Sequence, residues 1–177
     1  MRVITGRAKG IPLKSLKGND TRPTSDKIKE TMFSAIQFEL EDAVVADLFA
    51  GSGQLGIEAV SRGAKKAYFA DNNSAAVTVV KENLAKTGLS SNAETFRLPY
   101  NAFLRLCKEG FDIAFVDPPY YKGIIGKVFP LLIPKMNPSG IIICEHEKEL
   151  NLPDNLSGFT VDKVYCCGSV TLTIYRS

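Results

Sequence analysis

The most constraining feature of this sequence is a regular alternation of short apolar runs with amphipathic segments between positions 43 and 145. Each apolar run has the length of a buried strand, and each is followed by a stretch with helical periodicity. The predicted strands are 43–49, 66–71, 93–97, 112–117 and 139–145, and the predicted helices between them are 54–62, 74–87, 101–108 and 124–134. Repeated strand–helix units form a parallel sheet with helices on both faces. The alternation therefore predicts a doubly covered α/β fold.

The two ends of the chain depart from this alternation. The segments Arg2–Thr5 and Ile11–Leu16 flank a turn that contains glycine, and they predict a β-hairpin. Apolar residues repeat on one face of Ser25–Leu40, which predicts a helix packed on the main body. Near the other end, Phe159–Cys166 and Ser169–Arg176 read as two strands joined by a tight turn. The last strand is therefore expected to enter the sheet antiparallel to its neighbours.

Length and composition indicate a single domain. With 177 residues, 45% of them hydrophobic, the chain can bury one core, and we expect a basic arm (1–24) followed by a core (25–177). No apolar run reaches the roughly 20 residues that span a bilayer, and the start of the chain lacks a signal-peptide pattern, so a cytoplasmic location is expected. Four cysteines without Cys-x-x-Cys spacing and one histidine predict neither a zinc site nor disulfides.

Positive charge is concentrated at the amino terminus. The net charge is +3, yet eight of the 22 Lys and Arg residues fall within the first 29 positions, against two Asp residues. A solvated arm is one interpretation of this pattern, and binding to nucleic-acid phosphates is the other. For the second interpretation, the candidate RNA-binding residues are Arg2, Arg7, Lys9, Lys14 and Arg22.

A glycine-rich turn, Gly51-Ser52-Gly53-Gln54-Leu55-Gly56, joins the first predicted strand to its helix. This pattern allows a nucleotide to approach the backbone, and Asp71, at the end of the next strand, can accept hydrogen bonds from both ribose hydroxyls. A dinucleotide would place its pyrophosphate at the helix start, where Asp47 would repel it. S-adenosylmethionine has no pyrophosphate, and Asp47 can hold its methionine ammonium. The turn therefore favours S-adenosylmethionine; a turn that needs glycine only for packing is the remaining alternative.

Two asparagines extend this candidate cofactor site. Asn72 follows Asp71 on the ribose side. Asn101 lies at the carboxyl end of the third predicted strand, where open α/β sheets bind ligands, and could face the adenine. It could equally cap the helix that is expected to begin at Ala102.

The tetrapeptide Asp117-Pro118-Pro119-Tyr120 follows the apolar run 111–116. An exocyclic amine of a nucleobase is a poor nucleophile because its lone pair is delocalised into the ring. Acceptors for its two hydrogens favour a tetrahedral nitrogen, and the Asp117 carboxylate and the Pro118 carbonyl can be these acceptors. The prolines keep the backbone rigid, and Tyr120 offers a ring on which the base can stack. A plain Pro-Pro turn is the alternative, but the glycine turn upstream favours methyl transfer.

Five motifs span nearly the whole chain. They are Ile4-Thr5-Gly6, Thr21-Arg22-Pro23-Thr24-Ser25-Asp26, Asp47-Leu48-Phe49-Ala50-Gly51-Ser52-Gly53, Asp117-Pro118-Pro119-Tyr120 and Gly168-Ser169-Val170-Thr171-Leu172. Together they resemble the RsmD family of bacterial methyltransferases, which act on the N2 amine of a guanine in 16S ribosomal RNA. The Asp-Pro-Pro-Tyr motif is shared with DNA adenine methyltransferases, whereas the Thr-Arg-Pro-Thr segment is more specific.

The resemblance implies a Rossmann-like class I methyltransferase that uses S-adenosylmethionine. Its sheet would have seven mostly parallel strands with an antiparallel last strand, and the amino-terminal hairpin would be an appendage. The partner would be 16S ribosomal RNA in an assembled or assembling small subunit, with no metal and, by default, a monomeric enzyme. The cofactor residues carried over from the motif are Asp47, Phe49, Gly51, Ser52 and Gly53. The segment Arg97–Asn101 departs from the family, because it has an amide where an acid is common.

Three other functions remain open from the sequence. A DNA adenine-N6 methyltransferase would use the same tetrapeptide, but it usually needs a target-recognition region, and the loops here are short. A non-catalytic RNA-binding or ribosome-assembly factor could retain the fold, although the acidic and Asp-Pro-Pro-Tyr positions are intact. Protein glutamine methylation is associated with an Asn-Pro-Pro-Tyr form, and position 117 is Asp.

Overall fold

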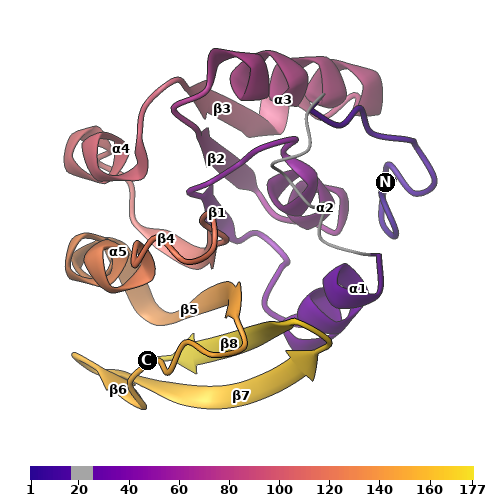
Figure 1. Cartoon of the computed structure of the whole chain (residues 1–177). Helices are drawn as coiled ribbons and strands as arrows, with labels where there is room; N and C mark the ends of the chain where they lie inside the picture. Colours follow the sequence, from indigo (N-terminus) through magenta and orange to yellow (C-terminus); the bar gives the residue numbers. More distant parts are fainter. Residues whose placement is uncertain (17–25) are drawn as a thin grey trace.

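The computed structural model describes residues 1–16 and 26–177, which form an α/β fold around an eight-stranded sheet (Figure 1). The helices are α1 (Asp26–Ala35), α2 (Gln54–Ser61), α3 (Ser74–Thr87), α4 (Tyr100–Leu106) and α5 (Ile125–Leu132), with single 3-10 turns at Ser90–Asn92 and Ile133–Lys135. The strands are β1 (Val44–Asp47), β2 (Lys66–Ala70), β3 (Ala93–Phe96), β4 (Phe111–Val116), β5 (Met136–Glu147), β6 (Asn155–Leu156), β7 (Phe159–Cys167) and β8 (Val170–Arg176).

The strand order is β3-β2-β1-β4-β5-β8-β7-β6. Strands β1 to β5 pair in parallel, and β8 pairs antiparallel with both β5 and β7. The parallel core and the antiparallel entry of the last strand are thereby confirmed. The chain leaves β1 first toward β2 and later returns to the other side of β1 with β4. In open α/β sheets such a reversal opens a crevice at the carboxyl ends of the strands, where ligands bind.

Helices cover both faces of the sheet, as the alternation predicted. Apolar residues of α1, α2 and α3 pack in one cluster with Val45 of β1 and Phe115 of β4, whereas α4 and α5 pack with Ala46 and Val116 on the opposite face. Figure 1 shows α4 and α5 on one side of the strands and the other helices across from them. Strands buried on both faces read as continuous apolar runs, which explains why the sequence showed them clearly.

Two element boundaries differ by three residues or more from the sequence-based expectation, and one strand was not expected. Helix α1 ends at Ala35, but Leu40 beyond it is still buried, so the apolar periodicity continued past the helix end. Strand β5 begins at Met136 instead of 139. The sheet gains an eighth strand, because the two residues of β6 pair with the start of β7. Such a short pairing leaves no periodic pattern in the sequence.

The described part of the arm, residues 1–16, forms less of a hairpin than expected. Its ladder is reduced to one isolated bridge between Arg2 and Pro12. The backbone N–H groups of Ile4 and Thr5 instead donate to the carboxylate of Glu58 on α2, at 2.8 and 3.0 Å. Backbone hydrogen bonds from Val3 to Ile11, from Gly10 to Val3 and from Leu13 to Met1 still join the two segments. The next donors, Ile4 and Thr5, are satisfied by α2, so two regular strands do not form.

Contacts with α2 and α3 fix the rest of the arm. Gly6 has a φ of +85°, and a Cβ there would lie 1.8 Å from the carbonyl oxygen of Ser61, so only glycine allows this approach. Farther along, the N–H of Lys14 donates to Oδ1 of Asn83 at 2.8 Å. The amide nitrogen of Asn83 in turn donates to the carbonyl oxygen of Ser52 at 2.9 Å. The buried Asn83 of α3 thereby links the arm to the glycine turn.

A buried ion pair lies beneath the arm. Lys29 and Glu58 are both fully buried, and their charged groups lie 3.7 Å apart. The ammonium of Lys29 also donates to the carbonyl oxygen of Arg2 at 2.6 Å, and Arg62 donates to Glu58 at 2.7 Å. Burial lowers the pKa of Lys29. The sequence counted Lys29 among the basic residues of the amino terminus, but the structure places it in the interior.

Candidate active site at the carboxyl edge of the sheet

The acidic residues predicted from the sequence gather at the carboxyl edge of the parallel strands. Asp47 ends β1, Asp71 follows β2, and Asp117 follows β4. Strand β1 lies between β2 and β4, so Asp47 stands between the other two carboxylates. Asn101 lies on the β3 side of the same edge, within α4. The fold therefore brings the predicted cofactor and catalytic residues to one crevice.

Asp71 fixes the conformation of the glycine turn. One carboxylate oxygen accepts a hydrogen bond from the N–H of Gly51 at 2.9 Å, and the other accepts one from the N–H of Asn73 at 2.8 Å. Gly51 and Gly53 have φ values of +53° and +78°, in the left-handed region that favours glycine. Asn73 caps α3 through its side-chain oxygen, whereas the neighbouring Asn72 is exposed. This structural role of Asp71 was not expected from the sequence.

Asp47 is a buried carboxyl group between β1 and α2. Only 2% of the residue is exposed, and its carboxylate accepts a hydrogen bond from the N–H of Gly56 at 3.1 Å. Burial raises the pKa of Asp47 to about 7; the Gly56 N–H opposes this shift, and the charge of Asp71 adds to it. A buried carboxyl group with a raised pKa at the edge of a crevice can bind a cation.

The third glycine of the motif has a packing role. A Cβ at Gly56 would lie 2.3 Å from the ring of Phe69 in β2, so a larger side chain would push α2 off the sheet. This close approach of helix and strand brings the start of α2 against Asp47. The packing interpretation of the glycine turn therefore holds for Gly56, whereas Gly51 and Gly53 set the backbone conformation of the turn.

The predicted adenine side carries two aromatic rings. Phe49 and Tyr100 lie in contact, with ring centroids 5.3 Å apart. Helix α4 begins at Tyr100 with Pro99 at its N-cap, so the expectation that Asn101 caps the helix is wrong. The side-chain oxygen of Asn101 accepts a hydrogen bond from the N–H of Ala102 at 2.9 Å, inside the first turn. Tyr100 was not expected at this site from the sequence. Its ring lies beside Phe49 because α4 begins close to the end of β3.

The Asp-Pro-Pro-Tyr segment lies against β5. Val116 pairs with Cys144, so Asp117 and Glu145 follow at corresponding positions of the adjacent parallel strands. The hydroxyl of Tyr120 donates to the carboxylate of Glu145 at 2.6 Å, and Glu145 is only 3% exposed. This bond holds the Tyr120 ring at the crevice. Glu145 could not be recognised from the sequence, because it is one acidic residue at the end of an apolar run.

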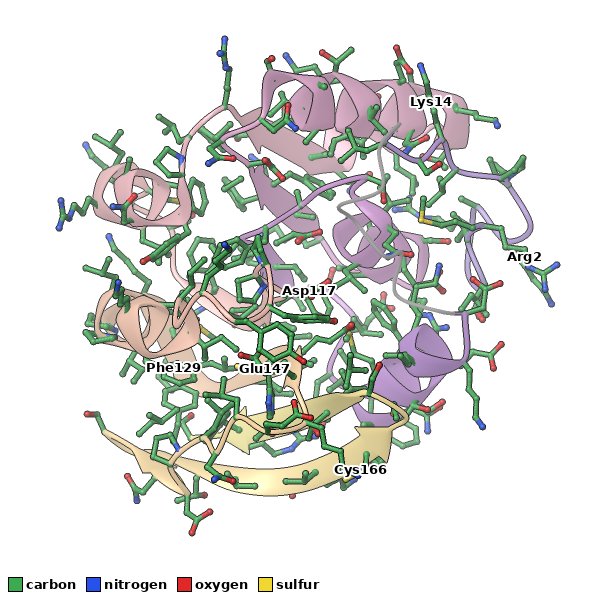
Figure 2. The ribbon with its side chains drawn as sticks, in the orientation of Figure 1. Arg2, Lys14, Asp117, Phe129, Glu147 and Cys166 are labelled. Atoms are coloured by element: carbon green, nitrogen blue, oxygen red, sulfur yellow. The ribbon has the colours of Figure 1, made fainter. Side chains whose placement is uncertain are left out.

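The turn after Tyr120 is also fixed by β5. Tyr121 has a φ of +59°, and its N–H donates to the carboxylate of Glu147 at 3.1 Å. Figure 2 labels Asp117, which follows β4, and Glu147, which ends β5, in the middle of the view. Pro118 is buried and Pro119 is exposed. The tetrapeptide is therefore held at both ends, by β4 before it and by β5 after it.

Replacing Tyr120 by phenylalanine is expected to lower the free energy of unfolding by about 1–2 kcal/mol, because the buried Glu145 loses a hydrogen-bond donor. Urea denaturation followed by circular dichroism would measure this difference. Tyr121→Phe is the matched control, since Tyr121 is 74% exposed and its hydroxyl removal should change stability by less than about 0.5 kcal/mol. Equal effects of the two substitutions would contradict the assigned role of the hydroxyl.

The candidate RNA-binding residues of the arm are exposed and lie along α2 and α3, with Arg7 at the C-terminal end of α2, away from the carboxyl edge of the sheet. Arg2 lies 3.7 Å from Asp26, and Lys14 lies 2.5 Å from Glu82, in exposed ion pairs. The Arg7 guanidinium donates to the carbonyl oxygen of Val60, and Lys9 is exposed. Figure 2 shows Arg2 and Lys14 at the edge of the molecule, beyond α2 and α3 and apart from Asp117. Arg22 and the segment Thr21–Ser25 lie outside the described residues.

The strand order, the glycine turn at the carboxyl end of β1 and the Asp-Pro-Pro-Tyr segment at the end of β4 define a Rossmann-like methyltransferase fold of the S-adenosylmethionine-dependent class. The chain belongs to the family described as Conserved hypothetical protein 95, whose model matches residues 1–176. The resemblance to the RsmD family is thereby confirmed at the level of the family.

Two curated relatives and one solved structure illustrate this membership. The chain is 35% identical to a Bacillus subtilis protein named "Putative rRNA methyltransferase YlbH", over 99% of this chain and 98% of the relative. It is 33% identical to Ribosomal RNA small subunit methyltransferase D of Haemophilus influenzae, over 100% of this chain and 94% of the relative. The structure of a hypothetical protein from Thermus thermophilus matches with a TM-score of 0.85 and 29% identity, covering 100% and 99% of the two chains.

Within residues 1–16 and 26–177, no helix has the length and apolar character needed to cross a membrane.

Proposed function

We propose that the protein transfers a methyl group from S-adenosylmethionine to the N2 amine of a guanine in 16S ribosomal RNA. The observation that carries this proposal is the position of Asp117 and Pro118 in the same crevice as the glycine turn, with Tyr120 fixed by Glu145. The names of the relatives support ribosomal RNA of the small subunit as the substrate. We infer that the RNA is presented in an assembled or assembling subunit.

The residues of the crevice fit S-adenosylmethionine. Asp47 is a buried carboxyl group with a raised pKa, and it would hold the methionine ammonium. Asp71 would accept from the ribose hydroxyls while keeping its bonds to the backbone, because a carboxylate has about four acceptor sites. Phe49 and Tyr100 would contact the adenine. When bound, the cofactor supplies a methyl group on an electrophilic sulfonium.

The target guanine would leave its stack to reach this crevice, as bases do in enzymes that modify their edges. Tyr120 would stack on the base, and Asp117 and the Pro118 carbonyl would accept hydrogen bonds from the two N2 hydrogens. Asp117 or water would take the proton that leaves the amine nitrogen once it is methylated. Positioning supplies most of the acceleration, because the reacting atoms are held in line.

The arm would bind phosphates of the substrate RNA. Arg2, Arg7, Lys9 and Lys14 are exposed on a segment that packs along α2 and α3, where Glu58 and Asn83 hold it in place. Contacts to phosphates carry no sequence information, and their strength falls steeply with salt. The choice of guanine would then depend on the shape of the ribosomal particle.

Binding of the cofactor is expected to release close to one proton at about pH 6, because an ammonium beside Asp47 favours its ionised form. Affinity should rise with pH through about 7 and level off above it. Titration calorimetry with S-adenosylhomocysteine in buffers of different ionisation enthalpy would count the protons. Asp47→Asn should abolish both the release and the pH dependence, and unchanged release in that variant would refute the role of Asp47.

The same pKa affects the protein without cofactor. The folded state holds the Asp47 proton more tightly than the unfolded chain, because its pKa is raised from 3.8 to about 7. This contribution to stability is fully present below the ordinary pKa of the carboxyl group and is lost as the pH rises through about 7. A cation bound at Asp47 removes this loss.

The test of the proposed function is transfer of labelled methyl from S-adenosylmethionine to small ribosomal subunits isolated from cells that lack this protein. Digestion and mapping of the labelled nucleoside should give N2-methylguanosine in 16S RNA. Label in adenine, with DNA as the better substrate, would favour a DNA adenine-N6 methyltransferase. Binding of both cofactor and RNA without any transfer would indicate a non-catalytic assembly factor.

A further inference from the structure

Gln54 carries an unsatisfied polar atom at the start of α2. The residue is 8% exposed, and its side-chain oxygen Oε1 is buried without a hydrogen-bond partner. Among the described residues it is the one buried side-chain polar atom in this condition. Buried acceptors almost always have a donor, because an unpaired one loses its bonds to water and gains none. The orphan atom therefore indicates a donor outside the described residues, and a bound ligand can supply one.

The position of Gln54 narrows what this donor can be. Gln54 directly follows Gly53 of the glycine turn, and Asp47 contacts the same helix end through Gly56. Gln54 and Glu58 are four residues apart and share one face of α2. Glu58 accepts from the arm and from Arg62. Gln54 lies one helical turn before Glu58, nearer the carboxyl edge of the sheet. Its side chain leaves the helix on the same face as that of Glu58, but its Oε1 has no donor among the described residues.

We propose that the side chain of Gln54 binds the amino-acid end of the methionine moiety of the cofactor, beside Asp47. An α-amino acid presents an ammonium and a carboxylate next to each other, and a primary amide is the neutral side chain that offers both an acceptor and donors. Oε1 would accept from the ammonium, which has three N–H donors. The positive end of the α2 dipole favours the carboxylate at the same place. This inference rests on the proposed use of S-adenosylmethionine.

Two ligands, one with the amino-acid end and one without it, test whether Gln54 binds that end. S-adenosylhomocysteine has the amino-acid end, whereas 5′-methylthioadenosine has the adenosine and thioether without it. In Gln54→Leu, calorimetry is expected to show affinity for S-adenosylhomocysteine lowered about 10- to 100-fold, as for a lost hydrogen bond to a charged group. Affinity for 5′-methylthioadenosine should stay within about twofold of wild type. Gln37→Leu, at an exposed glutamine beyond α1, is the matched control and should change neither value.

Thermal unfolding without ligand provides a second measurement. Leucine removes the orphan acceptor, so the midpoint of Gln54→Leu should equal or exceed that of wild type, and only its increase with S-adenosylhomocysteine should shrink. An equal loss for both ligands, or a lowered midpoint without ligand, would show a structural role and overturn the inference. Unchanged affinities with reduced transfer to RNA would assign the donor to the substrate and overturn it as well. Failure of the wild type to bind either ligand would instead refute the proposed function itself.

Discussion

Replacement of Asp117 by alanine is expected to lower the rate of methyl transfer by about 10²- to 10³-fold, the usual loss for one positioned electrostatic group. The amine would keep only one acceptor for its two hydrogens, and the nitrogen would lose its orientation toward the methyl group. The affinity for S-adenosylmethionine should not change, because Asp117 lies after β4, on the other side of β1 from Asp71. Single-turnover transfer to small subunits and calorimetry would measure the two quantities separately.

Asp154→Ala is the matched control for Asp117→Ala, because Asp154 is an exposed carboxylate before β6. It should leave both the rate and the affinity unchanged. Asp117→Asn keeps one acceptor oxygen and should recover part of the lost rate. If Asp117→Ala transferred methyl groups at the wild-type rate, the Asp-Pro-Pro-Tyr segment would be a structural turn and the proposed mechanism would fail.

Replacement of Glu58 by alanine is expected to lower the free energy of unfolding by about 3–5 kcal/mol, because Lys29 is left as an uncompensated buried charge. The N–H groups of Ile4 and Thr5 lose their acceptor in the same step. The start of the arm should therefore loosen from α2 and exchange its backbone hydrogens faster, while the bonds to Ser61 and Asn83 remain. Urea denaturation and hydrogen exchange over residues 1–16 would record the two effects.

Two further variants show whether the loss of stability in Glu58→Ala comes from the buried charge of Lys29. Glu58→Gln retains an acceptor for the arm but not the negative charge, and its effect should lie between wild type and Glu58→Ala. Glu82→Ala breaks the exposed pair with Lys14 and should change stability by less than about 1 kcal/mol. A small effect of Glu58→Ala, similar to that of Glu82→Ala, would mean that water reaches Lys29 and that the pair does not anchor the arm.

The sequence predicted the core of the fold well because its signals are local. The inner parallel strands β1, β2, β4 and β5 are buried on both faces and read as apolar runs, and each helix shows its own periodicity. Asp47, Asp71 and Asp117 could be identified because each follows such a run directly. The carboxyl ends of parallel strands share one edge, so their proximity followed from the topology.

The contacts of the arm, and the buried polar residues that hold the arm and the Asp-Pro-Pro-Tyr segment in place, were not predictable in this way. The expected hairpin was reduced to a bridge because Glu58 and Ser61, more than 50 residues away, accept its backbone donors. Lys29 looked like a surface residue, since nothing near it in the sequence indicates a buried partner. Asn83 follows Lys81 and Glu82 on an amphipathic helix, and Glu145 is followed by His146 and Glu147, so neither residue stands out in the sequence as a buried polar group.

The sequence by itself determined the α/β class, the glycine turn, the acidic positions at the strand ends and the Asp-Pro-Pro-Tyr segment, because these depend on residue type and short spacing. Only the tertiary structure decided that Tyr120 is held by Glu145, that the arm is anchored by Glu58 and Asn83, and that Gln54 lacks a partner. The physical reason is that burial and hydrogen-bond satisfaction depend on neighbours brought together by folding, and their separation along the chain carries no periodic signal.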